Sequence, residues 1–393
     1  MSNDTQPEIR FPGFTEDWKQ RKLGEVSKIG DIDHRMPPSV DDGIPYLMTG
    51  DFIEENELNF ENTKLVSEDD YLQLSKKIRP EYGDILFARY ASVGAVRYVS
   101  THRKFLISYS CAIIKPFSDI DGQFLYPTLK TQKMQQKIEF EINPNSQKNI
   151  GIDSLKKLPL FIPKMDEQQK IGTFFKQLDD TIALHQRKLD LLKETKKGFL
   201  QKMFPKNGAK VPEIRFPGFT EDWEERRLQE VVDRYDNLRI PITASKRVAG
   251  NTPYYGANGI QGYVEGYTHD GEFILVAEDG ANDLKNYPVQ YVDGKVWVNN
   301  HAHVIQAKEN LADNMFLMNA IRSINIEPFL VGGGRAKLNA DVLMKLEVII
   351  PLKSEQQKIG NFFKQLDDTI ALHQRELDVL KETKKGFLQK MFV

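Results

Sequence analysis

The chain has 393 residues, of which 40% are hydrophobic and 28% are charged. This length predicts two or three globular domains, and the composition is too apolar for a disordered chain. No stretch approaches the ~18 consecutive apolar residues of a membrane span, and the first residues lack the basic and apolar regions of a secretory signal. A single cysteine, Cys111, excludes an internal disulfide framework and a thiolate zinc cluster. We therefore expect a cytoplasmic protein.

The charges are nearly balanced, with 54 basic and 56 acidic residues and a net charge of -2. Dedicated nucleic-acid binders usually carry a basic surplus, so the balance does not suggest such a partner. It does not exclude one either, because charges can be sorted in space within a neutral chain.

Two internal repeats organise the chain. Residues 7–18 (Pro-Glu-Ile-Arg-Phe-Pro-Gly-Phe-Thr-Glu-Asp-Trp) recur without change as residues 212–223. Residues 167–204 recur as 355–392, and the copies differ only at the pairs Thr173/Asn361, Lys188/Glu376 and Leu191/Val379. The stretches between the repeats look largely unrelated. This pattern indicates a tandem duplication. The repeated blocks would bind one shared partner, or each other, whereas the two variable stretches would recognise different targets.

The order of the blocks predicts six segments. They are an N-terminal repeat block (1–18), a first variable domain (19–158), a central repeated helix (159–204), a linker with the second repeat block (205–223), a second variable domain (224–347) and a C-terminal repeated helix (348–393).

Each long repeat predicts a helix of about 36 residues, which is ~54 Å long. Asp166 with Gln169, and Ser354 with Gln357, have the spacing of a capping box. Apolar residues then recur at alternating intervals of four and three, which is a heptad pattern. The predicted helix-pair interface consists of Ile171, Phe175, Leu178, Ile182, His185, Leu189, Leu192, Ile359, Phe363, Leu366, Ile370, His373, Leu377 and Leu380.

Such a helix cannot bury its whole apolar face on a compact domain at one end. The duplicated helix supplies a partner, and a pseudo-twofold relation makes the pair antiparallel, with the variable domains at opposite ends of a rigid spacer. Within this interface we interpret His185 and His373 as packed histidines, with a pH switch or a metal site as the alternative.

Inside the variable domains, two alignments survive the divergence. Residues 83–94 align with 271–282, each an apolar strand that runs into a small polar loop, and residues 143–149 align with 331–337, each a flexible loop with a basic tip. Arginine can contact guanine bidentately, asparagine and glutamine can contact adenine, and small residues let a backbone approach phosphates. Together with the turn at residues 254–261, these loops give the candidate DNA contacts Arg89, Tyr90, Ser92, Arg97, Gln147, Lys148, Tyr255, Asn258, Gln261, Asn282, Lys285, Arg335 and Lys337.

Ordinary strands and turns with scattered polar residues remain an alternative for these loops. The charge count also weighs against DNA, since residues 224–346 hold 13 basic and 16 acidic residues. A DNA-reading domain with this balance must segregate its charges.

Catalytic motifs are lacking. The sequence has no Gly-x-x-x-x-Gly-Lys-Ser/Thr phosphate loop. Asn251-Thr-Pro-Tyr254 approaches the Asn-Pro-Pro-Tyr motif of adenine methyltransferases but has one proline fewer and no glycine-rich cofactor loop. His301 and His303 could share a strand face and bind a metal, but packing or DNA contact is the favoured interpretation. We therefore predict no catalytic and no metal-binding residue.

The Pro-Glu-Ile-Arg-Phe-Pro-Gly-Phe blocks and the Glu-Gln-Gln-Lys-Ile-Gly helix starts (167–172 and 355–360) resemble the specificity subunit of type I restriction-modification systems. The resemblance covers essentially the whole chain. It implies two target-recognition domains of mixed α/β (α+β) fold, separated by two long antiparallel coiled-coil helices, with each domain reading half of an interrupted site in double-stranded DNA. It also implies docking of two methyltransferase subunits and of restriction/translocase subunits, which would bind S-adenosylmethionine, ATP and Mg²⁺, whereas this chain binds no cofactor.

Two other functions stay open at this point. A coiled-coil adaptor that bridges two protein ligands without DNA fits the duplication and the helices equally well. A self-contained methyltransferase or nuclease is the third possibility, and the lack of catalytic motifs weighs against it.

Overall fold

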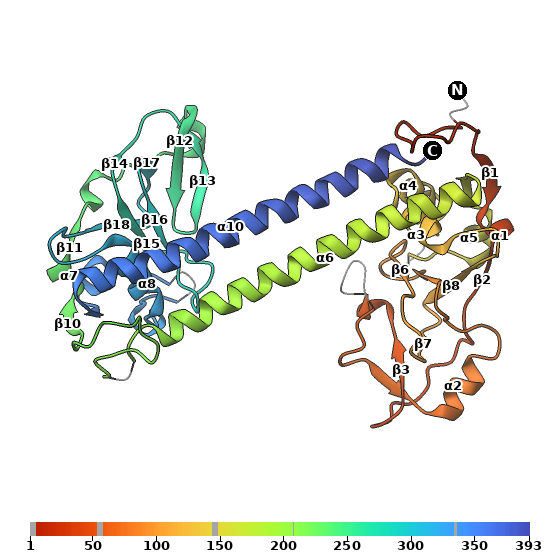
Figure 1. Ribbon diagram of the computed structural model, residues 1–393, viewed down its shortest axis with the longest axis horizontal. Coiled ribbons are helices and arrows are strands. Elements are labelled where there is room, and N and C mark those ends of the chain that lie inside the picture. The colour runs from red at the N-terminus through yellow and green to blue at the C-terminus, as the bar shows by residue number, and fades with distance from the viewer. Residues whose placement is uncertain (1–4, 53–57, 144–147, 207, 334–335) are drawn as a thin grey trace. The chain divides into compact units, whose positions relative to one another are not determined.

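The computed structural model describes residues 5–52, 58–143, 148–206, 208–333 and 336–393 (Figure 1). The contacts divide the chain into a first unit, Met1–Gln186 with Arg375–Val393, and a second unit, Arg187–Gln374. Each unit therefore holds one variable domain and a part of each long helix. Helices and sheets are mixed in both units, as the sequence predicted.

The first unit is built around an antiparallel sheet with the order β2-β8-β5-β6. Its central strand β5 (Ile85–Ala88) is apolar throughout because both of its faces are covered. Successive side chains of a strand point to opposite faces. Accordingly, Ile85 and Phe87 pack on the side of α3 and α4, whereas Leu86 packs with the residues around the second sheet, β4-β3-β7.

The bounds of the other elements of this unit are β1 Lys19–Lys22, α1 Leu23–Val26, β2 Ser27–Gly30, β3 Ile44–Leu47, β4 Lys64–Val66, α2 Glu68–Leu74, β6 Val96–Tyr98, β7 Leu106–Ile107, β8 Cys111–Pro116, α3 Gly122–Lys130, α4 Gln132–Phe140, α5 Ile152–Lys157 and β9 Pro159–Ile162, with a 3-10 turn at Thr49–Asp51. Strands β1 and β9 form an antiparallel pair, so the start of the first variable domain is tied to the strand that leads into the long helix.

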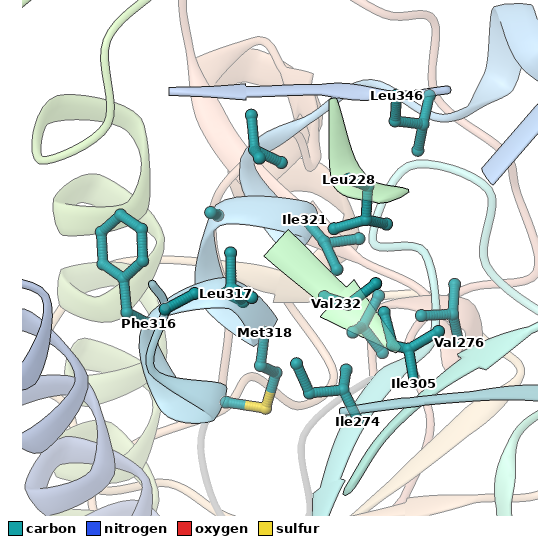
Figure 2. Packing of buried hydrophobic residues seen from close by; sticks show 14 of the residues in the cluster. Leu228, Val232, Ile274, Val276, Ile305, Phe316, Leu317, Met318, Ile321 and Leu346 are labelled. Atoms are coloured by element: carbon teal, nitrogen blue, oxygen red, sulfur yellow. The ribbon is translucent and has the colours of Figure 1, made fainter. Parts of the chain in front are cut away.

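The second unit has a corresponding sheet with the order β11-β18-β15-β16. In its central strand β15 (Phe273–Ala277), Ile274 and Val276 face helix α8 (Figure 2), whereas Phe273 and Leu275 face the sheet β13-β12-β17-β14. The bounds of the remaining elements are β10 Glu224–Arg227, α7 Leu228–Val231, β11 Val232–Arg234, β12 Ala249–Gly256, β13 Gly259–Val264, β14 His269–Asp270, β16 Val289–Val292, β17 Lys295–Val298, β18 Ala302–Ala307, α8 Asn314–Ser323, α9 Ala340–Leu343 and β19 Glu347–Ile350, with 3-10 turns at Asp236–Leu238, Ala244–Lys246 and Glu327–Phe329.

The central sheets of the two variable domains share one topology although the sequences of the domains look unrelated. Both central sheets are antiparallel, and each second sheet contains one parallel pair, β3 with β7 and β12 with β17. Strand β10 pairs with β19 as β1 pairs with β9. The duplication recognised from the repeats therefore extends through the variable domains.

The long repeats form the helices α6 (Met165–Lys202) and α10 (Lys353–Lys390). Asp166 and Ser354 lie inside the first turn, so the predicted capping boxes are wrong: the helices begin earlier, where the carbonyl oxygens of Lys164 and Leu352 accept the first bonds. Helix ends commonly shift by one or two residues in this way.

Within each unit the segments of α6 and α10 run antiparallel. In the first unit the ring of Phe174 lies 5.0 Å from that of Phe387 between centroids, and Lys384 binds Asp179. In the second unit the equivalent residues of the repeats make the same contacts, but each residue comes from the other helix. Phe199 of α6 lies 5.0 Å from Phe362 of α10 between ring centroids, and Lys196 of α6 binds Asp367 of α10. All fourteen predicted interface residues are buried or half-buried. Among them, Ile171, Phe175, Ile359 and Phe363 also belong to the cores of the variable domains.

The twelve-residue repeats anchor the start of each long helix. Arg10 binds Glu167 with two hydrogen bonds of 2.7 and 2.8 Å, and Arg215 binds Glu355 with the same two distances. Among the described residues, no helix is both long and apolar enough to cross a membrane.

Candidate nucleic-acid interface

In the first unit, the described residues of the two loops that the sequence singled out lie together. The β5–β6 loop (residues 89–95) and the 143–149 loop are joined by a bridge between Tyr90 and Asn149, and the backbone N–H of Ile150 donates to the carbonyl oxygen of Arg89 (3.1 Å). At the tip, Ala91 has φ of 60°, a left-handed conformation that a residue with a Cβ rarely adopts. Strain of this kind clusters at functional sites.

Arg89 holds these loops from inside. Its side chain is 7% exposed; Nη1 binds the Asp31 carboxylate (2.5 Å) and Nε donates to the carbonyl oxygen of Ile150 (3.0 Å). Burial opposes ionisation of Asp31, but hydrogen bonds from His34 and Lys77 and the charge of Arg89 outweigh it and hold the pKa of this carboxyl below its usual value. The contacts give Arg89 a positioning role, which the sequence did not reveal because Asp31 lies 58 residues away.

The second unit repeats this arrangement with other side chains. The β15–β16 loop (residues 278–288) and the 331–337 loop are bridged between Asp279 and Lys337, and the N–H of Leu338 donates to the carbonyl oxygen of Glu278 (2.7 Å). Arg89 and Glu278 each directly follow the central strand of their domain, so the charge at this position is positive in the first domain and negative in the second.

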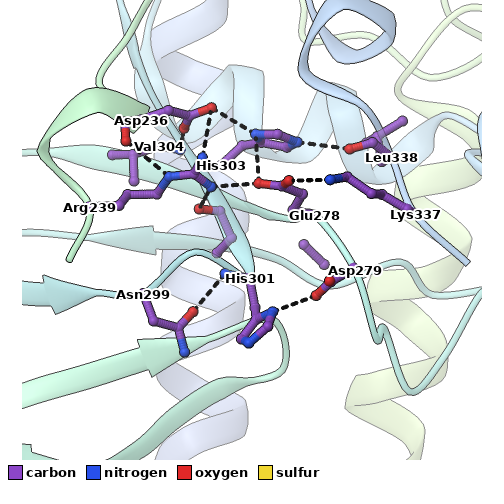
Figure 3. A network of polar contacts seen from close by, with 12 residues as sticks. Asp236, Arg239, Glu278, Asp279, Asn299, His301, His303, Val304, Lys337 and Leu338 are labelled. Carbon is purple, nitrogen blue, oxygen red and sulfur yellow. Dashed lines mark hydrogen bonds and ion pairs between the residues drawn. The ribbon is translucent and has the colours of Figure 1, made fainter. Parts of the chain in front are cut away.

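A charged network replaces the arginine in the second unit (Figure 3). His303, with its side chain 1% exposed, places Nδ1 2.8 Å from an Asp236 carboxylate oxygen and Nε2 2.8 Å from the carbonyl oxygen of Leu338. Both ring nitrogens therefore have a polar partner within hydrogen-bonding distance. Glu278 completes the network by binding Arg239 (2.6 Å) and Lys337 (2.9 Å).

A third loop joins this face in the second unit. The side chain of Asn258, at the turn between β12 and β13, donates to the carbonyl oxygen of Gly280 (2.9 Å) and accepts from the N–H of Asn282 (2.9 Å). Gly259 has φ of 107°, which favours glycine in this turn. The turn is therefore fixed to the β15–β16 loop, and the three predicted loops form one surface.

The structure places the predicted contact residues unequally. Ser92, Lys148, Asn258, Gln261, Asn282 and Lys285 are exposed, and Tyr90, Tyr255 and Lys337 are half-buried. Arg97 is buried in β6, where it donates to the carbonyl oxygens of Val96 and Phe52. Gln147 and Arg335 lie outside the described residues.

Sequence reasoning missed Asp31, Asp236, Arg239 and Glu278. Glu278 lies in the aligned stretch 271–282, whereas Asp31, Asp236 and Arg239 lie far from both aligned stretches in the sequence. The contacts of His303 support packing as its role: both nitrogens already face protein groups, and its neighbour His301 lies 2.6 Å from Asp279 through Nδ1.

Acid should weaken the second network. Burial opposes ionisation of both Asp236 and Glu278. The hydrogen bond with His303 nevertheless holds the pKa of Asp236 below its usual 3.8. Hydrogen bonds from Lys337 and Arg239 likewise hold the pKa of Glu278 below its usual 4.5. Groups with a lowered pKa in the folded state stabilise it above their unfolded pKa, and this contribution is lost as the pH falls through the folded pKa.

We therefore expect the free energy of unfolding of the second unit to fall as the pH drops below about 4. Urea unfolding between pH 7 and 3 measures it, and Glu278→Gln should flatten this part of the curve. The exposed Glu309→Gln variant is the control. An unchanged acid dependence in Glu278→Gln would contradict the assignment.

Comparisons with known proteins agree with this geometry. A family model described as "Type I restriction modification DNA specificity domain" matches residues 15–194 and 220–382. A candidate type I restriction enzyme specificity subunit of Haemophilus influenzae is 47% identical over 154 residues, which is 39% of each chain. Another, from Methanocaldococcus jannaschii, is 23% identical and covers 95% of this chain and 92% of its own.

One solved structure has the same fold over the full length. It is a type I restriction-modification S subunit from M. genitalium, which superposes with a TM-score of 0.72 at 18% identity over 99% of both chains.

Proposed function

The chain belongs to the family of type I restriction-modification DNA specificity subunits, and from that premise we propose that each variable domain reads one half of a bipartite, interrupted DNA sequence. The observation that carries the proposal is the shared loop pair: two domains of unrelated sequence bring the same two loops together beside the central strand. A scaffold that keeps its geometry while its loop residues change suits the reading of different base sequences.

The polar side chains of these loops are our candidates for base and phosphate contacts. Asparagine, glutamine and serine offer hydrogen bonds to base edges, and lysine offers a charge to phosphates. In the first domain they are Tyr90, Ser92 and Lys148, with Gln147; in the second they are Tyr255, Asn258, Gln261, Asn282, Lys285 and Lys337, with Arg335. Arg89 positions the first loop pair from inside.

In this proposal the chain is a non-catalytic subunit. The repeated helices set the distance between the half-sites and dock two methyltransferase subunits, which supply S-adenosylmethionine and methylate adenine; restriction/translocase subunits supply ATP hydrolysis with Mg²⁺. The near-identity of residues 167–204 and 355–392 supports docking of two copies of one partner. The complex would act in the cytoplasm, on cellular DNA.

Exchange of one domain tests the proposal. Replacing residues 19–158 by the corresponding domain of a relative should change one half of the methylated sequence and keep the other half and the spacing. Replacing residues 224–346 should change the opposite half. A methylated sequence that stayed the same in both exchanges would favour the adaptor without DNA recognition.

A further inference from the structure

A basic groove lies beside the candidate interface of the second unit. It has a volume of about 380 Å³, and its lining includes Lys193, Lys196 and Lys197 of α6, Arg322 of α8, and Asn286 and Tyr287 of the β15–β16 loop. Asn286 directly follows the predicted contact Lys285, and Tyr287 comes next. The groove therefore continues the loop surface onto the repeated helix.

The positive charge of this groove exceeds the negative charge that balances it. Asp367 of α10 binds Lys196 (2.5 Å) and lies 3.5 Å from Nη1 of Arg322, so one carboxylate serves two cations. Burial lowers the pKa of Lys196, and the charge of Arg322 lowers it further. Lys193 and Lys197 are exposed and, within the described part of the chain, form no ion pair.

We propose that this groove binds the phosphate backbone of double-stranded DNA beside the second half-site, so that α6 supplies positive charge that the second variable domain lacks. Residues 224–346 carry 13 basic and 16 acidic residues, and a DNA-reading domain with this balance needs cations from elsewhere. Lys193 and Lys197 lie one helical turn apart on α6, as two contacts to a phosphate backbone would require. This inference rests on the proposed function.

Phosphate contacts are independent of base sequence and release counterions. In the complex with the methyltransferase subunits, the double variant Lys193→Gln/Lys197→Gln should therefore bind DNA about tenfold more weakly at ~0.1 M salt, whether or not the second half-site is intact. The slope of log affinity against log salt should become less steep by about 1 to 2. Lys206→Gln/Lys210→Gln, which removes two exposed lysines outside both the groove and the repeated helices, is the charge-matched control and should keep both values.

Three results would overturn the inference, and they are distinguishable. An unchanged affinity and salt slope in the groove variant would show that the groove does not contact DNA. Loss of assembly with the methyltransferase subunits, with an unchanged salt slope, would assign the groove to an acidic protein surface. If the unmodified complex and the control bound no DNA either, the proposed function itself would fail.

Discussion

Replacing Arg89 by alanine should abolish recognition of the first half-site and leave that of the second intact. The guanidinium group is buried, and it joins Asp31 to the carbonyl oxygen of Ile150 at the base of both loops. Removing one partner of a buried ion pair leaves an uncompensated charge and costs about 3–5 kcal/mol. Because His34 and Lys77 still bind Asp31, we expect a loss of about 3 kcal/mol, measured by urea unfolding.

Two further variants separate positioning from general stability. Arg89→Lys can keep the charge beside Asp31 but loses the fork that also reaches Ile150, so it should recover stability more than recognition. Arg79→Ala removes an arginine of the same domain whose side chain is 54% exposed and whose ion pair with Glu81 should contribute less than about 1 kcal/mol. A methylated first half-site that is unchanged in Arg89→Ala would contradict the positioning role.

Replacing His303 by alanine should have the corresponding effect on the second half-site. The substitution removes the ring that contacts Asp236 and the carbonyl oxygen of Leu338, and it leaves a cavity at a buried position of strand β18. Together these losses should lower the free energy of unfolding by about 3–5 kcal/mol. Urea unfolding gives the stability, and sequencing of the methylated motif gives the half-site.

The neighbouring histidine provides the matched control. His301 lies just before β18, its side chain is 33% exposed, and its contact with Asp279 should contribute about 1 kcal/mol or less. His301→Ala should therefore keep most of the stability and both half-sites. Equal losses in the two variants would mean that burial of the network is not what holds the loops.

The repeats made much of the fold predictable. An apolar heptad pattern is a local signal, so the interface residues from Ile171 to Leu380 follow from spacing alone. The second copy of the helix then identifies the partner against which these residues pack. The helix starts were misplaced because Asp166 and Ser354 have the residue type of a cap but lie inside the first turn.

The candidate site was predictable as loops and less so as residues. The alignment of residues 83–94 with 271–282 depends on an apolar strand followed by a polar loop, and such a pattern is visible in sequence. Whether an arginine faces outward or inward depends on contacts far along the chain. Arg89 is buried because it binds the Asp31 carboxylate and the carbonyl oxygen of Ile150. Arg97 is buried because it donates to the carbonyl oxygen of Phe52.

Modification-sensitive sequencing of host DNA, with and without this gene and with the partner methyltransferase retained, tests the central claim most directly. We predict that one interrupted, adenine-methylated motif disappears on deletion and returns when the gene is restored. Persistence of every methylated motif, in cells shown to contain the active methyltransferase, would contradict it.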